Sequence, residues 1–360
     1  MIQQHGGNLR EISKACGIPE EEILDFSASI NPLGPPKGAL KAILDGMDRL
    51  VHYPEIDGMT LRERLAGEGN LSVENVLVGN GSSEFVYLVP RVLSPRRALV
   101  PVPSFSDYGR ALRLAGCGVV SFPLIAEESF RLDPGRLIDA LSEKIDLLVL
   151  CNPNNPTGGL LSAEEVLMVV DAAADRGIIV LCDEAFIDFV PDGSVRHRVK
   201  EFPNLLVLRS FTKFYGIPGL RAGAIYGDGV LVRRIGACQE PWTMNRLAGA
   251  AVAAALDDAE YRERTLELID AERAVLVGRL ASLPGVRVFP SSANFLLLET
   301  SSPMPEPDRL FGALLRAGIL VRNCASFSGL GPRFFRIAIR SSEENGLLLE
   351  TFQAVVRRFV

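Results

Sequence analysis

Short apolar runs alternate with amphipathic stretches along the middle of the chain, from about residue 75 to residue 225. A short run that is apolar throughout is typical of a strand buried on both faces, and the stretches between the runs have the period of a helix. This alternation predicts an α/β fold, in which helices cover both faces of a mostly parallel sheet. The expected strands are residues 76–78, 98–102, 119–122, 147–151, 178–182, 205–208 and 223–226.

The pattern changes after about residue 245. Residues 246–282 are expected to form one or two long helices, and less regular strands and helices follow them. The expected strands of this part are residues 286–289, 294–298, 319–322 and 334–339. Since 360 residues usually form more than one domain, we predict two. The large domain would be an α/β unit at residues 46–250, and residues 1–45 and 251–360 would form an N-terminal arm and a small α+β domain.

The composition excludes several classes of protein. The chain has 38 basic and 44 acidic side chains, a net charge of −6, and no basic block, so we expect no nucleic-acid binding. Its six cysteines and three histidines fit no disulfide or metal-site spacing, so we expect no metal. No apolar run approaches the ~18 residues of a membrane span, and the first residues do not resemble a signal peptide. We therefore expect a cytoplasmic protein that does not bind a membrane.

In an open parallel sheet, ligands bind beyond the carboxyl ends of the strands. Residues 79–84 follow the first strand and open a helix, whose free N–H groups could bind an anion with help from the hydroxyls of Ser82 and Ser83. An ordinary helix cap would look the same. Phe105 follows the second strand and could stack on a planar ring, although a core aromatic is the simpler interpretation.

Polar residues also follow the next two central strands. Asn152 and Asn155 each precede a proline in an irregular turn, and either amide could donate to a ligand oxygen or serve the turn alone. Asp183 is a carboxylate at the end of a buried strand, which is costly unless it is paired. A protonated ring nitrogen would suit it, and an arginine or a metal ion are the alternatives.

Lys213 is one of only six lysines and follows the strand at 205–208. A partly buried lysine can lose its proton and act as an amine nucleophile, whereas an ordinary solvated lysine would not have such apolar neighbours. An anion cradle, a stacking ring, an amide donor, a carboxylate and a nucleophilic amine are together what pyridoxal phosphate needs.

In this order, the motifs resemble those of the pyridoxal-phosphate-dependent class I/II aminotransferases of fold type I, over essentially the whole chain. The resemblance implies that Lys213 attaches the cofactor, that Asp183 keeps its ring nitrogen protonated, and that Asn155 donates to the ring 3′-oxygen. Phe105 would stack on the ring with Tyr108 near it. The cofactor phosphate would be bound by Ser82, Ser83, Ser210 and Arg221.

Two further positions bear on this resemblance. Tyr53 matches a family tyrosine that reaches the cofactor phosphate of the neighbouring subunit, which implies a homodimer with shared active sites. Many relatives have a tyrosine where this chain has Phe186. That difference would remove one hydrogen bond to the 3′-oxygen.

Two branches of the family are similar to the chain, the histidinol-phosphate aminotransferases and the threonine-phosphate decarboxylases. Residues 5–8, 25–34, 183–189 and 213–221 resemble the decarboxylases more closely. That resemblance implies decarboxylation of O-phospho-L-threonine to (R)-1-amino-2-propanol O-phosphate for cobalamin biosynthesis. Histidinol-phosphate transamination and decarboxylation of O-phosphoserine stay open, because the residue set is nearly the same for these reactions.

A small phosphorylated amino compound as substrate requires a second anion site. Arg322 is the candidate for the substrate phosphate, because a guanidinium fork matches phosphate oxygens, and His5 and Asn31 could assist it. Arg336 corresponds to the carboxylate-binding arginine of the family. Either arginine could instead form a surface ion pair. With these cations, we expect the cleft to be locally positive despite the net charge of −6.

Overall fold

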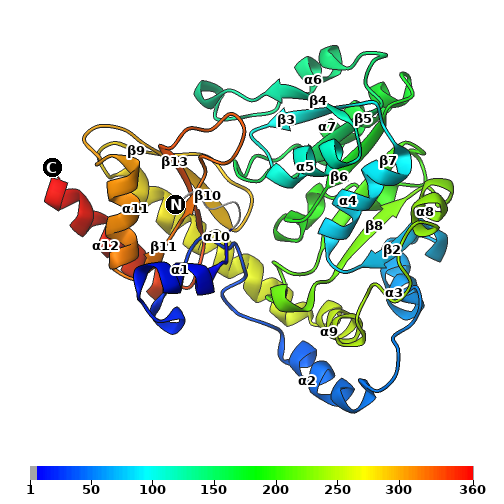
Figure 1. Ribbon diagram of the computed structural model, residues 1–360, viewed down its shortest axis with the longest axis horizontal. Coiled ribbons are helices and arrows are strands. Elements are labelled where there is room, and N and C mark those ends of the chain that lie inside the picture. The colour runs from blue at the N-terminus through cyan, green and yellow to red at the C-terminus, as the bar shows by residue number, and fades with distance from the viewer. Residues whose placement is uncertain (1–5, 360) are drawn as a thin grey trace.

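The structure is a computed structural model and describes residues 6–359. Figure 1 shows two groups of elements, a large sheet with its helices on one side and the C-terminal strands and helices on the other. The long helix α10 (Ala259–Ala281) extends between the two groups. Among residues 6–359, no helix is both long and apolar enough to cross a membrane.

The large sheet has seven strands in the order β2-β8-β7-β6-β5-β3-β4. Strand β8 is antiparallel to both of its neighbours, and the other pairs are parallel. The expected mostly parallel α/β sheet is therefore confirmed. Its strands are β2 (Val76–Gly79), β3 (Arg97–Val102), β4 (Gly118–Pro123), β5 (Leu147–Cys151), β6 (Ile179–Asp183), β7 (Leu205–Ser210) and β8 (Gly223–Gly227).

Alternate residues of each central strand pack into different cores, because side chains alternate between the faces of a strand. In β5, Leu148 belongs to the core that includes α7, and Val149 belongs to the core that includes α4 and α5. This explains why the central strands are apolar throughout. The helices of this part of the chain are α2 (Lys37–Gly46), α3 (Met59–Glu68), α4 (Ser82–Leu93), α5 (Ser106–Leu114), α6 (Pro134–Ala140), α7 (Ala163–Ala174), α8 (Gly229–Gly236) and α9 (Arg246–Leu256).

A second, antiparallel sheet has the order β12-β13-β10-β9. Its strands are β9 (Val286–Val288), β10 (Phe295–Thr300), β12 (Arg322–Asn323) and β13 (Phe334–Ala338), and the remaining helices are α1 (Leu9–Cys16), α11 (Pro307–Arg316) and α12 (Ser342–Phe359). The prediction of one strand at residues 319–322 was wrong. The chain changes partner there, since β11 (Ile319–Leu320) pairs with β1 (Leu24–Asp25), and β12 pairs with β13.

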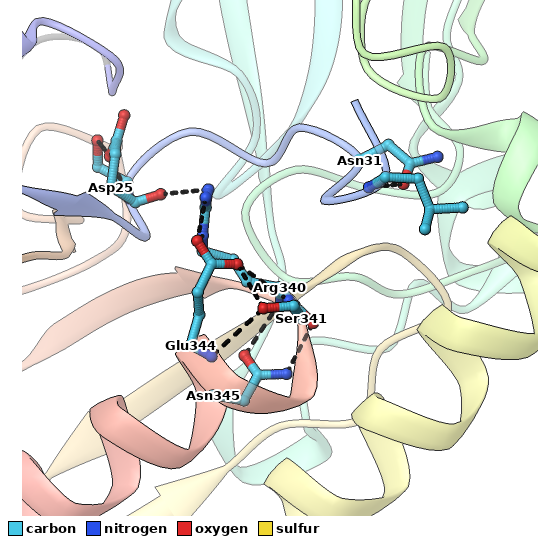
Figure 2. Close-up of polar contacts among 8 residues, drawn as sticks. Asp25, Asn31, Arg340, Ser341, Glu344 and Asn345 are labelled. Atoms are coloured by element: carbon cyan, nitrogen blue, oxygen red, sulfur yellow. Dashed lines mark hydrogen bonds and ion pairs between the residues drawn. The ribbon is translucent and has the colours of Figure 1, made fainter. Parts of the chain in front are cut away.

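The N-terminal segment is fastened to the C-terminal elements by Arg340. Figure 2 shows this side chain between Asp25 and Glu344: its Nη1 donates to the carbonyl oxygen of Asp25 at 3.0 Å, and its Nε donates to Glu344 Oε1 at 2.9 Å. Ser27 is fixed next to this contact, because its N–H and hydroxyl both donate to the Asp25 carboxylate. Residues that follow β1 are thereby held against the C-terminal part. The division into domains at residues 45/46 and 250/251 stays a prediction.

Candidate active site

A cavity of about 390 Å³ lies beyond the carboxyl ends of β5 and β6, where a doubly wound sheet is expected to bind its ligand. Three cationic and two acidic side chains line it, which agrees with the expectation of a locally positive cleft. Nine of the predicted site residues line this cavity: Ser82, Ser83, Phe105, Tyr108, Asn155, Asp183, Lys213, Arg221 and Arg336.

Lys213 lies on the loop after β7, and its Nζ donates to the hydroxyl of Ser210 at 3.1 Å. Burial lowers the pKa of Lys213 to about 8, with further lowering by Arg221 and Arg336, against the opposing effect of Asp183. An amine with this pKa is partly unprotonated near neutral pH and can act as a nucleophile. Ser210 does not line the cavity but positions the amine that does.

Asp183 is buried at the end of β6. Its Oδ2 accepts a hydrogen bond from the Tyr108 hydroxyl at 2.7 Å, and its Oδ1 accepts one from the N–H of Ala185 at 3.0 Å. Burial raises the pKa of Asp183, while Tyr108, Lys213 and the Ala185 N–H oppose this rise. The site therefore contains a buried carboxylate that a cationic ring nitrogen could pair with.

The start of α4 forms the anion cradle. The helix opens with Ser82 and Ser83, and Nη2 of Arg221 donates to the Ser83 hydroxyl at 3.0 Å. Gly81 has φ +83°, and a side chain there would place its Cβ 2.5 Å from Nη2 of Arg221. The positive φ favours glycine at this turn, and Ser82, Ser83 and Arg221 all line the cavity, so helix N–H groups, two hydroxyls and a guanidinium are available to an anion there.

Arg336 of β13 brings the second sheet to the same cavity. Its Nη1 donates to Oδ1 of Asn155, and its Nη2 donates to the carbonyl oxygen of Ser27 at 2.9 Å. Because Oδ1 of Asn155 accepts this bond, the amide nitrogen of Asn155 is the group left to donate to a ligand. Burial lowers the pKa of Arg336 to about 10, and its buried Nε has no hydrogen-bond partner in the part of the chain that the structure describes. A bound anion would neutralise the charge of the guanidinium and could accept a hydrogen bond from this Nε.

Three predicted residues of the described part of the chain lie elsewhere. Asn31 is buried away from the cavity, and its amide donates to Phe214, Tyr261 and Thr265, so it fastens the segment after β1 instead of reaching the ligand. Figure 2 shows Asn31 on this segment, apart from the Arg340 contact.

The other two are Arg322 and Tyr53. Arg322 is buried on β12 next to Arg336 in the sheet, and its Nη2 donates to the Ser326 hydroxyl at 2.8 Å. Tyr53 is 77% exposed and contacts Trp242, with 4.9 Å between the ring centres. His5 lies outside the described residues.

Sequence reasoning missed other residues of the cavity. Gly6, Ser27, Ala28, Ser29 and Ile30 form one wall. The segment at 25–34 carries part of the family resemblance, but no hydrophobic period shows that it would cross to the large sheet. Cys151 also lines the cavity, and its place at the end of β5 was a signal that could have identified it.

The donor set fits pyridoxal phosphate. The cradle at α4 with Arg221 suits its phosphate, Asp183 its ring nitrogen, Asn155 its 3′-oxygen and Lys213 its aldehyde carbon. Phe105 is oriented by an edge-to-face contact with Tyr108, at 5.5 Å between ring centres, and lines the cavity as a stacking ring would. Within residues 6–359, no cluster of His, Cys, Asp and Glu is arranged to hold a metal ion.

Comparisons with known proteins agree with this site. Residues 21–352 match the family described as aminotransferase class I and II. The chain is 38% identical to threonine-phosphate decarboxylase of Salmonella typhimurium, over 98% of this chain and 96% of that protein. It is 34% identical to the adenosylcobalamin biosynthesis bifunctional protein CobDQ of Leptospira interrogans, over 98% of this chain and 41% of that protein.

A solved structure is similar as well. The histidinol-phosphate aminotransferase of Clostridium acetobutylicum aligns with a TM-score of 0.87 and 31% identity, over 93% of this chain and all of that one. The family match, the fold and the arrangement of Lys213, Asp183 and Arg221 agree. The chain belongs to the class I and II aminotransferase family, with the fold-type I architecture.

Proposed function

We propose that the protein is a pyridoxal-phosphate-dependent decarboxylase that converts O-phospho-L-threonine to (R)-1-amino-2-propanol O-phosphate. The position of Arg336 carries this proposal. Its guanidinium lies in the same cavity as Lys213 and Asp183, and its buried Nε has no hydrogen-bond partner within residues 6–359. A carboxylate there would lie beside the residues that hold the cofactor.

The similarity to a threonine-phosphate decarboxylase supports the reaction, and the similarity to an adenosylcobalamin biosynthesis protein supports a role in making cobalamin. Arg322 neighbours Arg336 across β12 and β13 and is our candidate for the substrate phosphate. We also propose His5 as a residue that assists at this phosphate.

When bound, pyridoxal phosphate supplies a protonated ring that withdraws electrons from the bonds at the substrate Cα. The residues of the chain decide which bond breaks. Arg336 would hold the carboxylate, and Asp183 would keep the proton on the ring nitrogen. Lys213, with its pKa near 8, can release and take up a proton close to neutral pH.

We infer that the protein acts as a homodimer in the cytoplasm. Several large apolar side chains between residues 44 and 56 are exposed, including Leu44 at 72% and Val51 at 82%. Patches of this kind mark interaction surfaces. Tyr53 lies in this segment, contacts Trp242 and does not line the cavity of its own chain, and we propose that it serves the partner's site.

Histidinol-phosphate aminotransferase is the second candidate function, favoured by the structural similarity to such an enzyme. To separate the candidates, the loaded protein is given O-phosphothreonine, O-phosphoserine, or histidinol phosphate with 2-oxoglutarate. We expect turnover with O-phosphothreonine and slower turnover with O-phosphoserine, which lacks one methyl group. Turnover of histidinol phosphate with 2-oxoglutarate, and of neither phosphorylated amino acid, would contradict the proposal.

A further inference from the structure

The hydroxyl of Tyr108 forms a hydrogen bond with Asp183 and is not directed at a ligand. Both side chains are buried, and the hydroxyl of Tyr108 on α5 lies 2.7 Å from Oδ2 of Asp183 at the end of β6. A tyrosine that contacted the ligand through its hydroxyl would direct that hydroxyl to the open part of the cavity. Here the hydroxyl is occupied by the carboxylate.

The direction of this hydrogen bond is fixed by protonation. Burial and the nearby negative charge of Asp183 raise the pKa of Tyr108 well above its ordinary value, so the phenol keeps its proton and donates it. Cys151 lies on the same side, and burial raises the pKa of its thiol to about 12. Its Sγ donates to the carbonyl oxygen of Pro153 at 3.4 Å and also contacts the Tyr108 hydroxyl, so the neighbouring thiol is neutral and adds no charge beside Asp183.

Other charged side chains line the same cavity as Asp183, namely Asp107, Lys213, Arg221 and Arg336. Lys213 contributes its positive charge, and Cys182 precedes Asp183 on β6 as a buried thiol whose pKa is raised well above its ordinary value. If Lys213 attaches the cofactor, its amine is committed to that role. The donors that remain for the carboxylate are then the Tyr108 hydroxyl and the Ala185 N–H.

A hydrogen bond donated to a carboxylate makes it a weaker base. In a buried pair of a carboxylate and a ring nitrogen, one proton is shared, and it rests on the stronger base. Burial alone strengthens Asp183 as a base and would draw the proton from the nitrogen. The Tyr108 hydroxyl opposes that effect.

We propose that Tyr108 is a positioning residue whose hydroxyl holds Asp183 as an oriented carboxylate, so that the shared proton stays on the ring nitrogen of the cofactor. The statement about the ring nitrogen rests on the proposed function, because it presumes that pyridoxal phosphate is the cofactor. The contact between Tyr108 and Asp183 is a property of the chain itself. The two parts can be measured separately.

Tyr108→Phe removes only the hydroxyl and keeps the ring that packs edge-to-face on Phe105. Tyr226→Phe is the matched control, because Tyr226 is also buried and lies in the core on the other face of the sheet from Tyr108. The first measurement uses protein without cofactor and ¹³C-labelled aspartate. The Asp183 carboxyl signal is identified by its loss in Asp183→Asn.

In this measurement, Tyr108→Phe should raise the titration midpoint of Asp183 by about one to two pH units, the usual size of a hydrogen bond to a charged group. Tyr226→Phe should leave it unchanged. An unchanged midpoint in Tyr108→Phe overturns the inference, whatever the protein is found to catalyse.

The second measurement uses the loaded protein with ¹⁵N in the pyridine ring. The ring-nitrogen signal should be that of a protonated nitrogen in the wild type and in Tyr226→Phe, and should move toward the neutral value in Tyr108→Phe. We expect kcat to fall about tenfold with KM nearly constant, since no substrate contact is removed. An unmoved signal overturns the inference. Failure of the wild type to attach the cofactor contradicts the proposed function instead, and the first measurement still decides the contact with Asp183.

Discussion

The Nη1 atom of Arg336 donates a hydrogen bond to Oδ1 of Asn155, although the two residues are 181 positions apart in the sequence. The bond joins β13 of the C-terminal sheet to the turn after β5 of the large sheet. It orients the Asn155 amide, which by our proposal donates to a cofactor oxygen, and holds a guanidinium in the same cavity. If the proposed roles hold, one side-chain contact links cofactor binding to substrate binding.

Substitution of Arg336 should damage substrate binding more than cofactor attachment. Arg336→Lys keeps a positive charge but loses the planar fork, so we expect kcat/KM for O-phosphothreonine to fall about 100-fold or more. The cofactor absorbance should persist, because Lys213 is unchanged. Arg333→Lys is the control, since Arg333 pairs with Glu306 at the surface and should retain full activity. Equal losses in both variants would contradict the assignment.

Lys213→Ala should abolish covalent attachment of pyridoxal phosphate. The visible absorbance of the bound cofactor should disappear, and mass spectrometry after borohydride reduction should show no added mass. Lys144→Ala is the matched control, because Lys144 is exposed. If the attached cofactor survives in Lys213→Ala, another amine holds it and the site is wrongly identified.

The pH dependence of cofactor attachment follows from the pKa of Lys213, which burial lowers to about 8. The unprotonated amine is the reactive form, so the attachment rate should rise about tenfold per pH unit below pH 8 and level off above it. Stopped-flow absorbance on protein without cofactor measures this profile. A rate that still climbs toward pH 10.5, the ordinary value for lysine, would contradict a buried amine.

Glu184 should make stability depend on pH. Its buried carboxyl accepts hydrogen bonds from Ser194 and the Val195 N–H, yet burial raises its pKa from 4.5 to about 7. Between these two values the folded protein binds more protons than the unfolded chain, so the free energy of unfolding decreases as pH rises, by up to about 3 kcal/mol. Denaturant titrations at several pH values should show this slope in the wild type and lose it in Glu184→Gln.

The control for this prediction is Glu201→Gln, because Glu201 lies at the surface in an ion pair with Arg198. That variant should keep the slope of the wild type. A slope that is unchanged in Glu184→Gln would show that other groups cause the pH dependence.

Much of the fold and of the site could be predicted from the sequence. The central strands are buried on both faces, so their apolar runs are visible; Asp183 follows one such run directly, and Lys213 lies on the loop after another. The break between β11 and β12 was not visible in the sequence, because the residues before Arg322 form one apolar run. Only the change of pairing partner, from β1 to β13, separates the two strands.

The errors at the site have a common physical cause. Asn31 is polar and belongs to a resembling motif, but only the folded chain shows that Phe214, Tyr261 and Thr265 occupy its amide. Ser27 was missed for the opposite reason, since its contribution is a backbone carbonyl that accepts from Arg336. Hydrogen-bond partners far apart in the sequence leave no periodic signal.

The central claim is that the chain decarboxylates its substrate, and the direct measurement is the fate of the substrate carboxyl carbon. O-phosphothreonine labelled with ¹³C at the carboxyl group is incubated with the loaded protein, and labelled CO2 and keto acid are quantified together with the amine product. We predict one labelled CO2 for each 1-amino-2-propanol phosphate formed and no labelled keto acid. Labelled keto acid without CO2 would show transamination and contradict the proposal.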